Sequence, residues 1–501
     1  MIKNFIYKGI FKDSVVLMQA AQKAKNGTGA GEISAVMGSP ANRSLLANIG
    51  LLTEDGKKAL NDDLILAVKS DRGEIIEKAG EVFFSFLEAK DERKERGKPE
   101  LTLEEALPGS DLLYLSLPGD YVYPRAKKAV LSGKDVMIFS DNVTLEEEID
   151  LKKTAEKRKV LVMGPDCGTA IYKGVYLGFV NRVRKGRIGI VGASGTGIQE
   201  VSSLIHNLGS GVSQAIGTGG RDGKKEVGGI MLLRGLEILD KDPETDVICL
   251  IAKPPAEEVQ KKIRDRLAET KKRWVVNFIG ESGKEKGFVS TLEETALLAV
   301  SLSTGKKKKI VPDREAERIF LSQSRKTVKS HKYVRGLYSG GTLTHEFLAL
   351  SHKAGIEVFS NVSPEGRYKL SSGFESRGHT VIDMGEDEFT RGRPHPMIDF
   401  SLRKERIVKE ASDREVRAVF FDVVLGYNSH PDPAAELAEA VQRAGKKSAK
   451  RHILFCASLT GTADDPQGYT KQKETLMKAG IAVFPSHALM VRHILEVLGK
   501  K

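Results

Sequence analysis

Cysteine is scarce in this chain of 501 residues. The three cysteines are Cys167, Cys249 and Cys456, and no two of them form a CxxC pair. An odd and widely spread set argues against a disulfide framework or a zinc ribbon, and favours a reducing, cytoplasmic environment. The HExxH motif, clusters of histidine and cysteine, and the GxSxG motif are also missing, so we expect no metal site.

Long apolar runs and aromatic clusters are missing as well. No run of about 18 apolar residues occurs, and the charged first residues have no apolar stretch behind them, so neither a membrane span nor a signal peptide is expected. The net charge is +12, but the only tight basic run, residues 306–309, has no aromatic neighbours of the kind that single-strand binders use. We expect no nucleic-acid or membrane partner, and the positive balance suits a small anionic substrate.

Glycine and aliphatic residues are abundant, with 50 glycines and 40% hydrophobic residues, which favours an α/β fold. In residues 1–184, short apolar segments alternate with helical patterns, which predicts βαβ units and a mainly parallel sheet. The expected strands are residues 33–37, 64–68, 112–117, 136–140 and 160–163. The expected helices are residues 123–132 and 144–157, and residues 83–105 are interpreted as a charged, helical, peripheral excursion.

Residues 185–305 and 333–501 resemble each other and are interpreted as duplicated domains. They are joined by residues 306–332, a basic linker with few apolar residues and with helical character. Each opens with a strand, a glycine turn that carries hydroxyl groups, and a helix. The opening strands are residues 187–191 and 335–338. Further strands are expected at residues 247–251, 274–278, 418–424, 453–457 and 481–484.

The two glycine turns are the main candidates for a binding site. Glycine lets backbone N–H groups approach a ligand, and the following helix directs its unpaired first amides and its positive dipole end at the same point. A phosphate or a carboxylate suits that position. A tight turn with an N-cap would look the same in a single copy, whereas two facing copies would converge on one anion. The candidates are Ser194, Gly195, Thr196 and Gly197 in the first turn, and Gly340, Gly341 and Thr342 in the second.

Neither turn has the spacing of a dinucleotide fingerprint or the lysine of a P-loop. Other loops carry polar residues where open α/β sheets place ligands. Asp166 and Cys167 follow the last predicted strand of residues 1–184, although a proline turn with a buried cysteine would read the same way. Arg221 lies in a glycine-rich loop and suits a bidentate contact to a carboxylate or phosphate. Lys253 follows another strand, just before two prolines.

The loop at residues 391–399 combines Arg391, Arg393, His395 and Asp399 between prolines. Substrate or subunit contact and an ordered surface loop are both open interpretations of this segment. Arg393 is a candidate for carboxylate contact, and His395 is a candidate general base.

Several of these segments together resemble a known family. Residues 139–145, 163–168, 189–196 and 217–222 are similar in order and sequence to turns of the succinyl-CoA synthetase α subunit. Residues 333–501 resemble the carboxy-terminal domain of the β subunit. Two further motifs, Met37-Gly38-Ser39-Pro40-Ala41-Asn42 and residues 392–399, resemble FdrA-type proteins specifically. The resemblance implies a Rossmann-like domain of the CoA-binding type followed by two flavodoxin-like domains.

Two departures from the synthetase pattern bear on function. No histidine lies between His206 and His331, where the synthetase carries its phosphohistidine, and the glycine-rich CoA loop is missing from the first region. An ATP-grasp domain is missing too. An acyl-CoA synthetase function would therefore rest on fold analogy alone.

The resemblance to FdrA-type proteins implies a subunit of oxamate carbamoyltransferase, acting in purine and allantoin catabolism with phosphate or carbamoyl phosphate as substrate. Other subunits of that complex, or further copies of this chain, are the expected partners. One alternative is an ADP-forming acyl-CoA synthetase that binds CoA. Another is a non-catalytic scaffold subunit that senses an anion.

Overall fold

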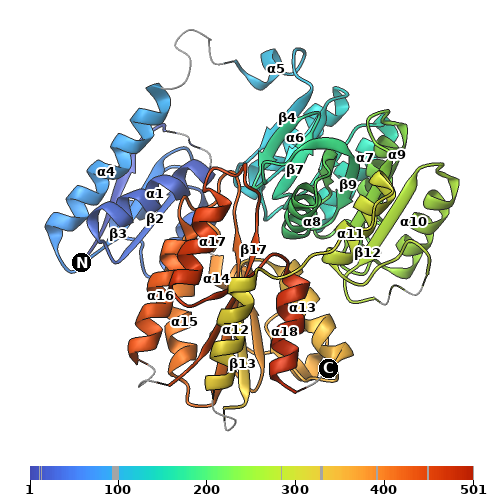
Figure 1. The fold of residues 1–501 in the computed structure, drawn as a ribbon. Coiled ribbons are helices and arrows are strands. Elements are labelled where there is room, and N and C mark those ends of the chain that lie inside the picture. The colour runs from blue at the N-terminus through green and yellow to red at the C-terminus, as the bar shows by residue number, and fades with distance from the viewer. Residues whose placement is uncertain are drawn as a thin grey trace.

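The computed structural model describes residues 1–10, 12, 14–92, 101–281, 283, 285–327, 331–390, 393–447 and 451–499. The strands of this part of the chain form four sheets, two of three strands and two of six. Figure 1 shows the amino-terminal sheet and its helices as a separate lobe, and the two six-stranded sheets as neighbouring layers of strands and helices. None of the described helices is long and apolar enough to cross a membrane.

The first sheet is antiparallel throughout. Its order is β1-β3-β2, and it consists of β1 (Ile2–Tyr7), β2 (Glu32–Met37) and β3 (Leu64–Lys69). The prediction of a mainly parallel sheet is therefore wrong for residues 33–37 and 64–68. The central strand β3 is buried along almost its whole length, and a fully buried strand has the same continuous apolar pattern in either orientation.

Helices α1 (Ser14–Thr28) and α4 (Gly73–Glu92) pack beside each other in this lobe, with α2 (Pro40–Asn48) and α3 (Glu54–Lys57) in the connections. The prediction that residues 83–105 form a peripheral excursion is wrong for the start of that segment, because Phe83 and Leu87 are buried in the lobe's core. Residues 93–100 lie outside the described part of the chain.

The second sheet is small and parallel, as the alternation of strands and helices predicts. It contains β4 (Leu112–Leu115), β5 (Asp135–Ile138) and β6 (Val162–Met163). Its helical elements are α5 (Leu103–Ala106), the 3₁₀ turn Gly119–Tyr121, α6 (Val122–Leu131) and α7 (Leu145–Arg158). Capping boxes fix the starts of α5 and α7, in which Thr102 and Thr144 exchange hydrogen bonds with a glutamate three residues later.

The third sheet has the order β12-β11-β9-β10-β7-β8. Its strands are β7 (Thr169–Tyr172), β8 (Val175–Gly178), β9 (Lys185–Gly192), β10 (Val212–Gly217), β11 (Val247–Ala252) and β12 (Arg273–Phe278). The last four pair in parallel, while β7 and β8 pair antiparallel at one edge. Its helices are α8 (Gly195–Asn207), α9 (Ile230–Lys241), α10 (Glu257–Glu269) and α11 (Leu292–Thr304).

The fourth sheet is parallel throughout, in the order β14-β15-β13-β16-β17-β18. Its strands are β13 (Tyr333–Tyr338), β14 (Phe359–Ser360), β15 (Thr380–Asp383), β16 (Val416–Val424), β17 (Leu454–Thr460) and β18 (Ala482–Phe484). Its helices are α13 (Gly341–Lys353), α14 (Asp387–Thr390), α15 (Ser401–Ser412), α16 (Pro433–Lys447), α17 (Tyr469–Lys478) and α18 (His487–Val497), with a 3₁₀ turn at Gly366–Tyr368. The strands that open the two duplicated domains, β9 and β13, lie where the strand order reverses, and open α/β sheets bind ligands at such points.

Part of the predicted linker is an integral helix. Within residues 306–332, α12 (Arg314–Lys326) packs on the fourth sheet, where the ring of Phe320 lies 5.8 Å from that of Phe484. Gln323 also accepts a hydrogen bond from the backbone of Phe455 at 3.2 Å. The basic run before α12 drew attention away from the apolar residues of the helix, so its packing on the sheet was not predicted. This part of the linker is a packed helix and not a free connector. Residues 328–330 lie outside the description.

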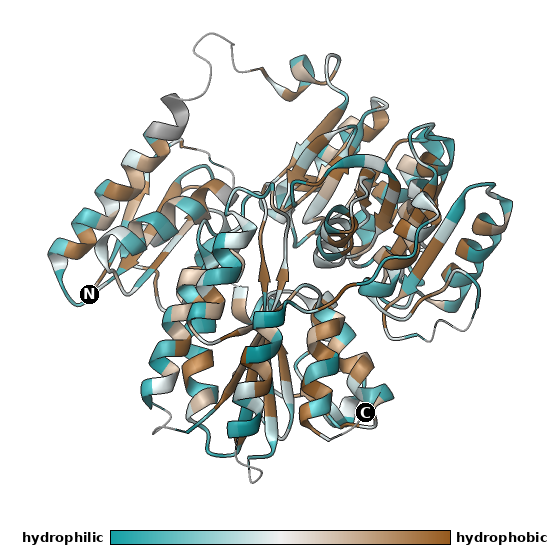
Figure 2. Ribbon diagram, in the orientation of Figure 1, coloured by the Kyte–Doolittle hydropathy of each residue, from teal (hydrophilic) through white to brown (hydrophobic). Residues whose placement is uncertain are grey.

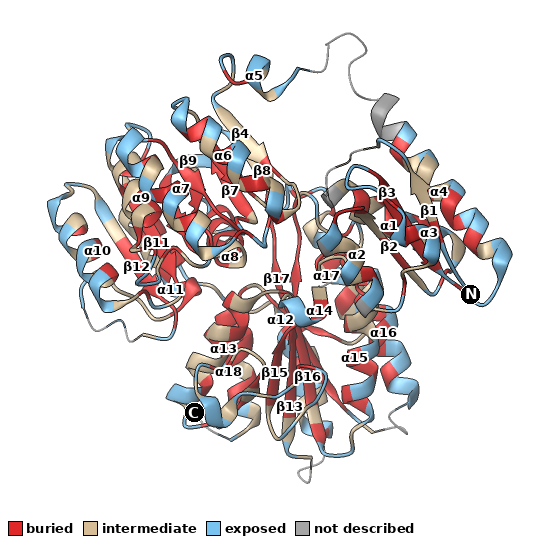
Figure 3. Ribbon diagram, turned by 180° about the vertical axis from the view of Figure 1, so that it is seen from behind, coloured by how far each residue is buried: buried red, intermediate tan, exposed pale blue. Residues whose placement is uncertain are grey.

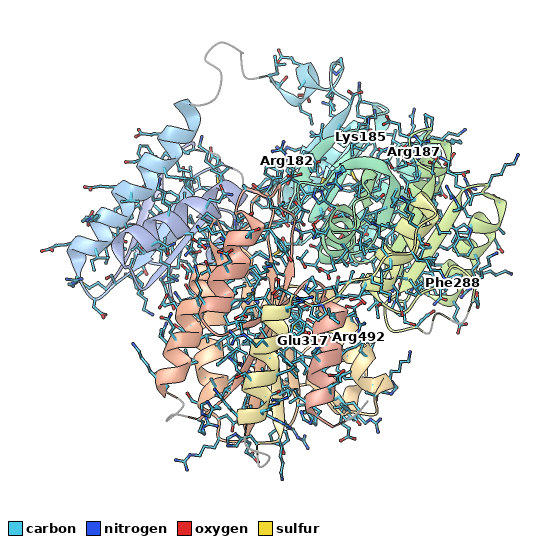
Figure 4. The ribbon with its side chains drawn as sticks, viewed as in Figure 1. Arg182, Lys185, Arg187, Phe288, Glu317 and Arg492 are labelled. Atoms are coloured by element: carbon cyan, nitrogen blue, oxygen red, sulfur yellow. The ribbon has the colours of Figure 1, made fainter. Side chains whose placement is uncertain are left out.

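The two large domains share a core and a hydrogen-bonded interface. One apolar cluster includes residues of both sheets, such as Ile190 of β9 and Phe420 of β16. Figure 2 shows the strands of the fourth sheet as predominantly hydrophobic, and Figure 3 shows them as buried. At the backbone of Arg182, labelled in Figure 4, the amide donates to Asp465 at 2.8 Å and the carbonyl accepts from Thr462 at 2.6 Å. This interface fixes how the two duplicated domains face each other.

Candidate functional site

The first glycine turn connects β9 to α8. Ser194 is the N-cap residue of α8, and its hydroxyl accepts a hydrogen bond from the amide of Gly197 at 3.0 Å. Gly197 therefore gives its amide to the cap and does not line the cavity described below. The amides of Gly195 and Thr196, which precede it, lie at the positive end of the helix dipole.

The second turn connects β13 to α13 and differs in its cap. Gly340 occupies the N-cap position and has no side chain to cap α13. Ser339 turns inward instead, where its amide donates to the buried Asp422 at 2.9 Å and its hydroxyl donates to the other carboxylate oxygen. The guanidinium of Arg403 donates to Asp422 at 2.7 Å and neutralises it. The first amides of α13 are thus left without a side-chain cap.

The structure brings the two turns into contact. The hydroxyls of Ser194 and Thr342 share a hydrogen bond across the domain interface. A Cβ placed on Gly340 would lie only 2.9 Å from the methyl carbon of Thr196, so glycine is needed for this approach. The two helices therefore begin side by side at one point, and which ligand they bind stays a prediction.

A cavity of about 230 Å³ opens at this point. It is lined by loops that follow several strands of both large sheets and by the loop after β6. Nine of the residues proposed from the sequence line it, namely Asp166, Cys167, Ser194, Gly195, Thr196, Gly340, Gly341, Thr342 and His395. Its size is below the roughly 300–1,000 Å³ of pockets that enclose drug-sized ligands, so a small ligand fits it best.

Lys253 is a cavity residue that sequence reasoning placed at a strand end without assigning it a role. It follows β11, and its ammonium forms no hydrogen bond or ion pair with any residue the structure describes. A Cβ placed on Gly341 would lie 3.4 Å from its Nζ. An unpaired, half-buried ammonium above the start of α13 suits an anionic ligand.

Asp383, at the end of β15, was missed because the sequence did not reveal that strand. The side chain is buried, and its Oδ1 accepts a hydrogen bond from the amide of Gly385 at 2.8 Å. Its Oδ2 would lie 2.8 Å from a Cβ on Gly341, close to the start of α13. Burial, and then the negative charge of Glu386, raise the pKa of Asp383 to about 7. This carboxyl therefore exchanges its proton near neutral pH.

Asp166 and Glu386 add further carboxyl groups to the lining. Asp166 keeps its side chain open to the cavity. The loss of hydrating water next to the cavity wall, and then the negative charge of the nearby Asp141 carboxylate, raise the pKa of Asp166 to about 6. The glycine turns alone predict a site with only positive groups for an anion. The cavity differs from that prediction, because acidic groups line it together with the helix starts and Lys253.

His395 lines the cavity, but its hydrogen bonding does not fit the predicted role of general base. Its Nδ1 accepts a hydrogen bond from the amide of Met397 at 3.2 Å, so in the neutral ring the proton is on Nε2. Burial lowers the pKa of His395 to about 4, which keeps the ring neutral. This arrangement makes His395 a hydrogen-bond donor to the cavity.

Cys167 is held as a neutral thiol. Its Sγ lies 3.4 Å from the carbonyl oxygen of Gly217 and 3.6 Å from that of Thr169. Burial raises the pKa of the Cys167 thiol to about 12. A thiol without thiolate character is a poor nucleophile, so Cys167 serves the shape of the cavity wall.

The two arginines proposed for carboxylate contact lie outside the cavity lining. The Nε of Arg221 is 2.7 Å from the buried Glu148 carboxylate, and its Nη2 donates to the carbonyl of Val143 at 2.8 Å. Arg221 thereby ties its loop to α7. Arg393 lies 3.9 Å from Glu32 of the first lobe, and the neighbouring Arg391 is outside the described residues.

Comparisons with known proteins agree with this architecture. A CoA-ligase family model matches residues 337–496, and a CoA binding domain model matches residues 183–280. The latter match falls on the third sheet rather than on residues 1–184. A model of the heavy metal-associated domain of AllF matches residues 1–102. The fold and the paired helix starts thus define an α/β protein of the succinyl-CoA synthetase-like class.

Among curated proteins, the uncharacterized protein YahF of Escherichia coli strain K12 is 37% identical over 499 residues, which cover 97% of this chain and 96% of YahF. The chain belongs to the same family, the FdrA family. The ADP-forming sulfoacetate-CoA ligase subunit SqwL of an Acholeplasma species is 28% identical over 160 residues, which cover 31% of this chain and 53% of that subunit. A solved acetyl-coenzyme A synthetase 1 of Ca. Korarchaeum cryptofilum is 16% identical and covers 78% of this chain and 82% of its own, with a TM-score of 0.29, too low to bear on this fold.

The AllF match names a heavy metal-associated domain, but the residues present do not fit a soft metal ion. Residues 1–102 contain neither cysteine nor histidine, the ligands that such ions prefer. The described residues also contain no group of three or more His, Cys, Asp or Glu side chains placed to hold a metal.

Proposed function

We propose that this chain is the phosphate-binding subunit of an oxamate carbamoyltransferase in purine and allantoin catabolism. The observation that carries the proposal is the contact between two helix starts, linked through Ser194 and Thr342, beside the unpaired ammonium of Lys253. Backbone amides, helix dipoles and one lysine ammonium are groups that hold a phosphoryl group without a nucleotide-binding domain. Membership of the FdrA family and the AllF domain match support the pathway.

The reaction needs nothing beyond its two substrates. A phosphate oxygen attacks the carbamoyl carbon of oxalurate, a C–O bond forms, and the C–N bond to the oxamate nitrogen breaks. The proton of hydrogen phosphate moves to that nitrogen, so the products are oxamate and carbamoyl phosphate. No electron is transferred, and no nucleotide or CoA takes part.

Each residue of the cavity is given a role in this reaction according to where it lies. The amides at the starts of α8 and α13, with Lys253, would hold the phosphate dianion and orient its oxygen toward the carbamoyl carbon. The Nε2–H of His395 would donate to the oxygen on which negative charge develops during attack. The carboxylates of oxalurate and oxamate find no arginine in the lining of the cavity, so the partner subunits would supply that contact.

The test uses the chain assembled with its partner subunits. We expect phosphate-dependent loss of oxalurate, and we expect Lys253→Met to lower kcat/KM at least about 100-fold, since one charged contact to a transferring group contributes about 3 kcal/mol. Lys261→Met, at an exposed position on α10, is the matched control and should keep wild-type activity. An active complex in which Lys253→Met behaves like Lys261→Met would contradict the proposal.

An acyl-CoA ligase is the second candidate, favoured by the CoA-ligase and CoA binding domain matches. CoA is larger than the cavity of about 230 Å³ and would lie mostly outside it. The nitrogen of His395 that could accept a phosphoryl group is also occupied, because Nδ1 accepts the Met397 amide and Nε2 carries the proton. Nucleotide-dependent thioester formation by the purified complex would favour this second function.

A further inference from the structure

The acidic side of the cavity calls for a ligand that is more than an anion. Asp383, Asp166 and Glu386 share the cavity with Lys253 and the two helix starts. A ligand with negative charge alone would be repelled by these carboxyls. A ligand that carries a phosphoryl group at one end and N–H donors at the other would match both sides.

Asp383 is the carboxyl most clearly placed for such a ligand. Only 2% of its surface is exposed, and Oδ1 is already paired with the amide of Gly385 at 2.8 Å. No residue that the structure describes donates a hydrogen bond to Oδ2. An acceptor oxygen without a protein donor on a cavity wall is available to a hydrogen-bond donor of a bound ligand.

Asp383 and Lys253 lie close enough to act on one small molecule. A Cβ placed on Gly341 would lie 2.8 Å from Asp383 Oδ2 and 3.4 Å from Lys253 Nζ, so both groups surround the same point at the start of α13. They form no ion pair with each other, which leaves both for the ligand. A molecule of the size of carbamoyl phosphate can therefore contact Asp383 Oδ2 and Lys253 Nζ at the same time.

We infer that Asp383 Oδ2 accepts a hydrogen bond from the amide NH₂ of a carbamoyl substrate, while Lys253 and the start of α13 hold the attached phosphoryl group. This subsite rests on the proposed function and deepens it, because it explains how a carbamoyl group is told apart from an acyl group. An acyl phosphate has a carbon where the carbamoyl group has its NH₂. A site built to pair with a donor rejects an analogue that lacks it, because the buried acceptor is left unpaired.

The test compares two stable analogues that differ only at that position. Phosphonoacetamide carries the NH₂, whereas acetonylphosphonate carries a methyl group in its place. Titration calorimetry of the full chain should give a Kd at least about tenfold lower for phosphonoacetamide, the discrimination expected from one buried hydrogen bond. Inorganic phosphate should compete with both compounds.

Asp383→Asn should abolish or reverse the preference. The new amide oxygen must stay with the Gly385 amide, so the NH₂ group replaces Oδ2 and faces the ligand as a donor. The tenfold ratio of the two Kd values should fall to about one or below, although both compounds still bind. Asp265→Asn, at an exposed position on α10, makes the same chemical change away from the cavity and should keep the wild-type ratio.

The outcomes separate this inference from the function on which it rests. Equal Kd values in the wild type, or an unchanged ratio in Asp383→Asn, would overturn the NH₂ subsite while leaving the phosphate site intact. A preference that appears only with added Mg²⁺ would also overturn it, because the carboxyls would then act through a cation. Failure of phosphate and of both analogues to bind would instead count against the proposed function.

Discussion

The two duplicated glycine turns have different caps, although the helices that follow them meet at one cavity. At the start of α8, Ser194 caps its own helix and binds the amide of Gly197. At the start of α13, Gly340 offers no cap, and Ser339 is drawn away by the buried pair of Asp422 and Arg403. The first copy is stabilised from within its turn, and the second depends on a charge pair beneath it. The duplicated domains therefore have one turn with a side-chain cap and one without.

The largest difference between the copies is expected in stability. Asp422→Ala would leave the Arg403 guanidinium buried without its partner, which costs about 3–5 kcal/mol. Ser194→Ala removes the N-cap hydrogen bond and the hydrogen bond to Thr342, and should cost about 2 kcal/mol. Urea denaturation of the two variants measures both values. Equal losses would show that the two turns are supported in the same way, and Asp422→Asn should recover part of the larger loss because it keeps an acceptor.

A methyl group at the first position of each helix should separate the copies by activity. Gly341→Ala would put its Cβ 2.8 Å from Asp383 Oδ2, whereas Gly195→Ala would meet the Thr169 hydroxyl at 3.1 Å, a contact that a small shift relieves. We expect a loss of kcat/KM of about 100-fold for the first and about tenfold or less for the second, that is, about 2.7 and at most 1.4 kcal/mol.

Steady-state kinetics of the assembled complex is the measurement for this pair. Circular dichroism checks that each variant is folded. Similar losses for the two variants would mean that the ligand uses both helix starts equally, contrary to the difference between their caps.

The smallest effect is a pH dependence that belongs to the second copy. The pKa of Asp383 is about 7 in the folded chain, above that of an exposed aspartate, so the folded state binds the extra proton between about pH 4 and pH 7. Its contribution to stability is complete at low pH and is lost as the pH rises through 7. The Tm of the Asp383→Asn variant should therefore fall less than the Tm of the wild type between pH 5 and pH 7.5. A shift of about 2–4 °C corresponds to 1 kcal/mol in domains of this size, and parallel Tm curves would contradict the assignment.

The sequence was sufficient for the two turns because each carries its signal locally. Strand, glycine and hydroxyl follow one another within about ten residues around Ser194 and around Thr342, and the structure places both at the predicted helix starts. The antiparallel order of the first sheet carried no such signal, since strand direction depends on connections that close over long distances. Asp383 was missed for a related reason, because β15 is only four residues long and has no apolar run around it.

Pairing between side chains could not be predicted from spacing. Arg221 has the right residue type for an anion, yet Glu148 on α7, far from it in the sequence, already holds it. Lys253 has the same charge but no partner among the described residues. Which of these two cations is free for a ligand depends on how the domains pack, and the sequence does not show this. His395 was found from its loop, but its tautomer depends on the Met397 amide, which a sequence cannot show.

The placement of both large domains in a single polypeptide has a consequence for assembly. One polypeptide carries both halves of the cavity, so the two halves are always present in equal numbers. Helix α12, in the connection between them, packs on the fourth sheet. Their effective concentration for each other does not change when the chain is diluted. The two halves of the cavity therefore stay together at any concentration of the chain, whatever else binds to it.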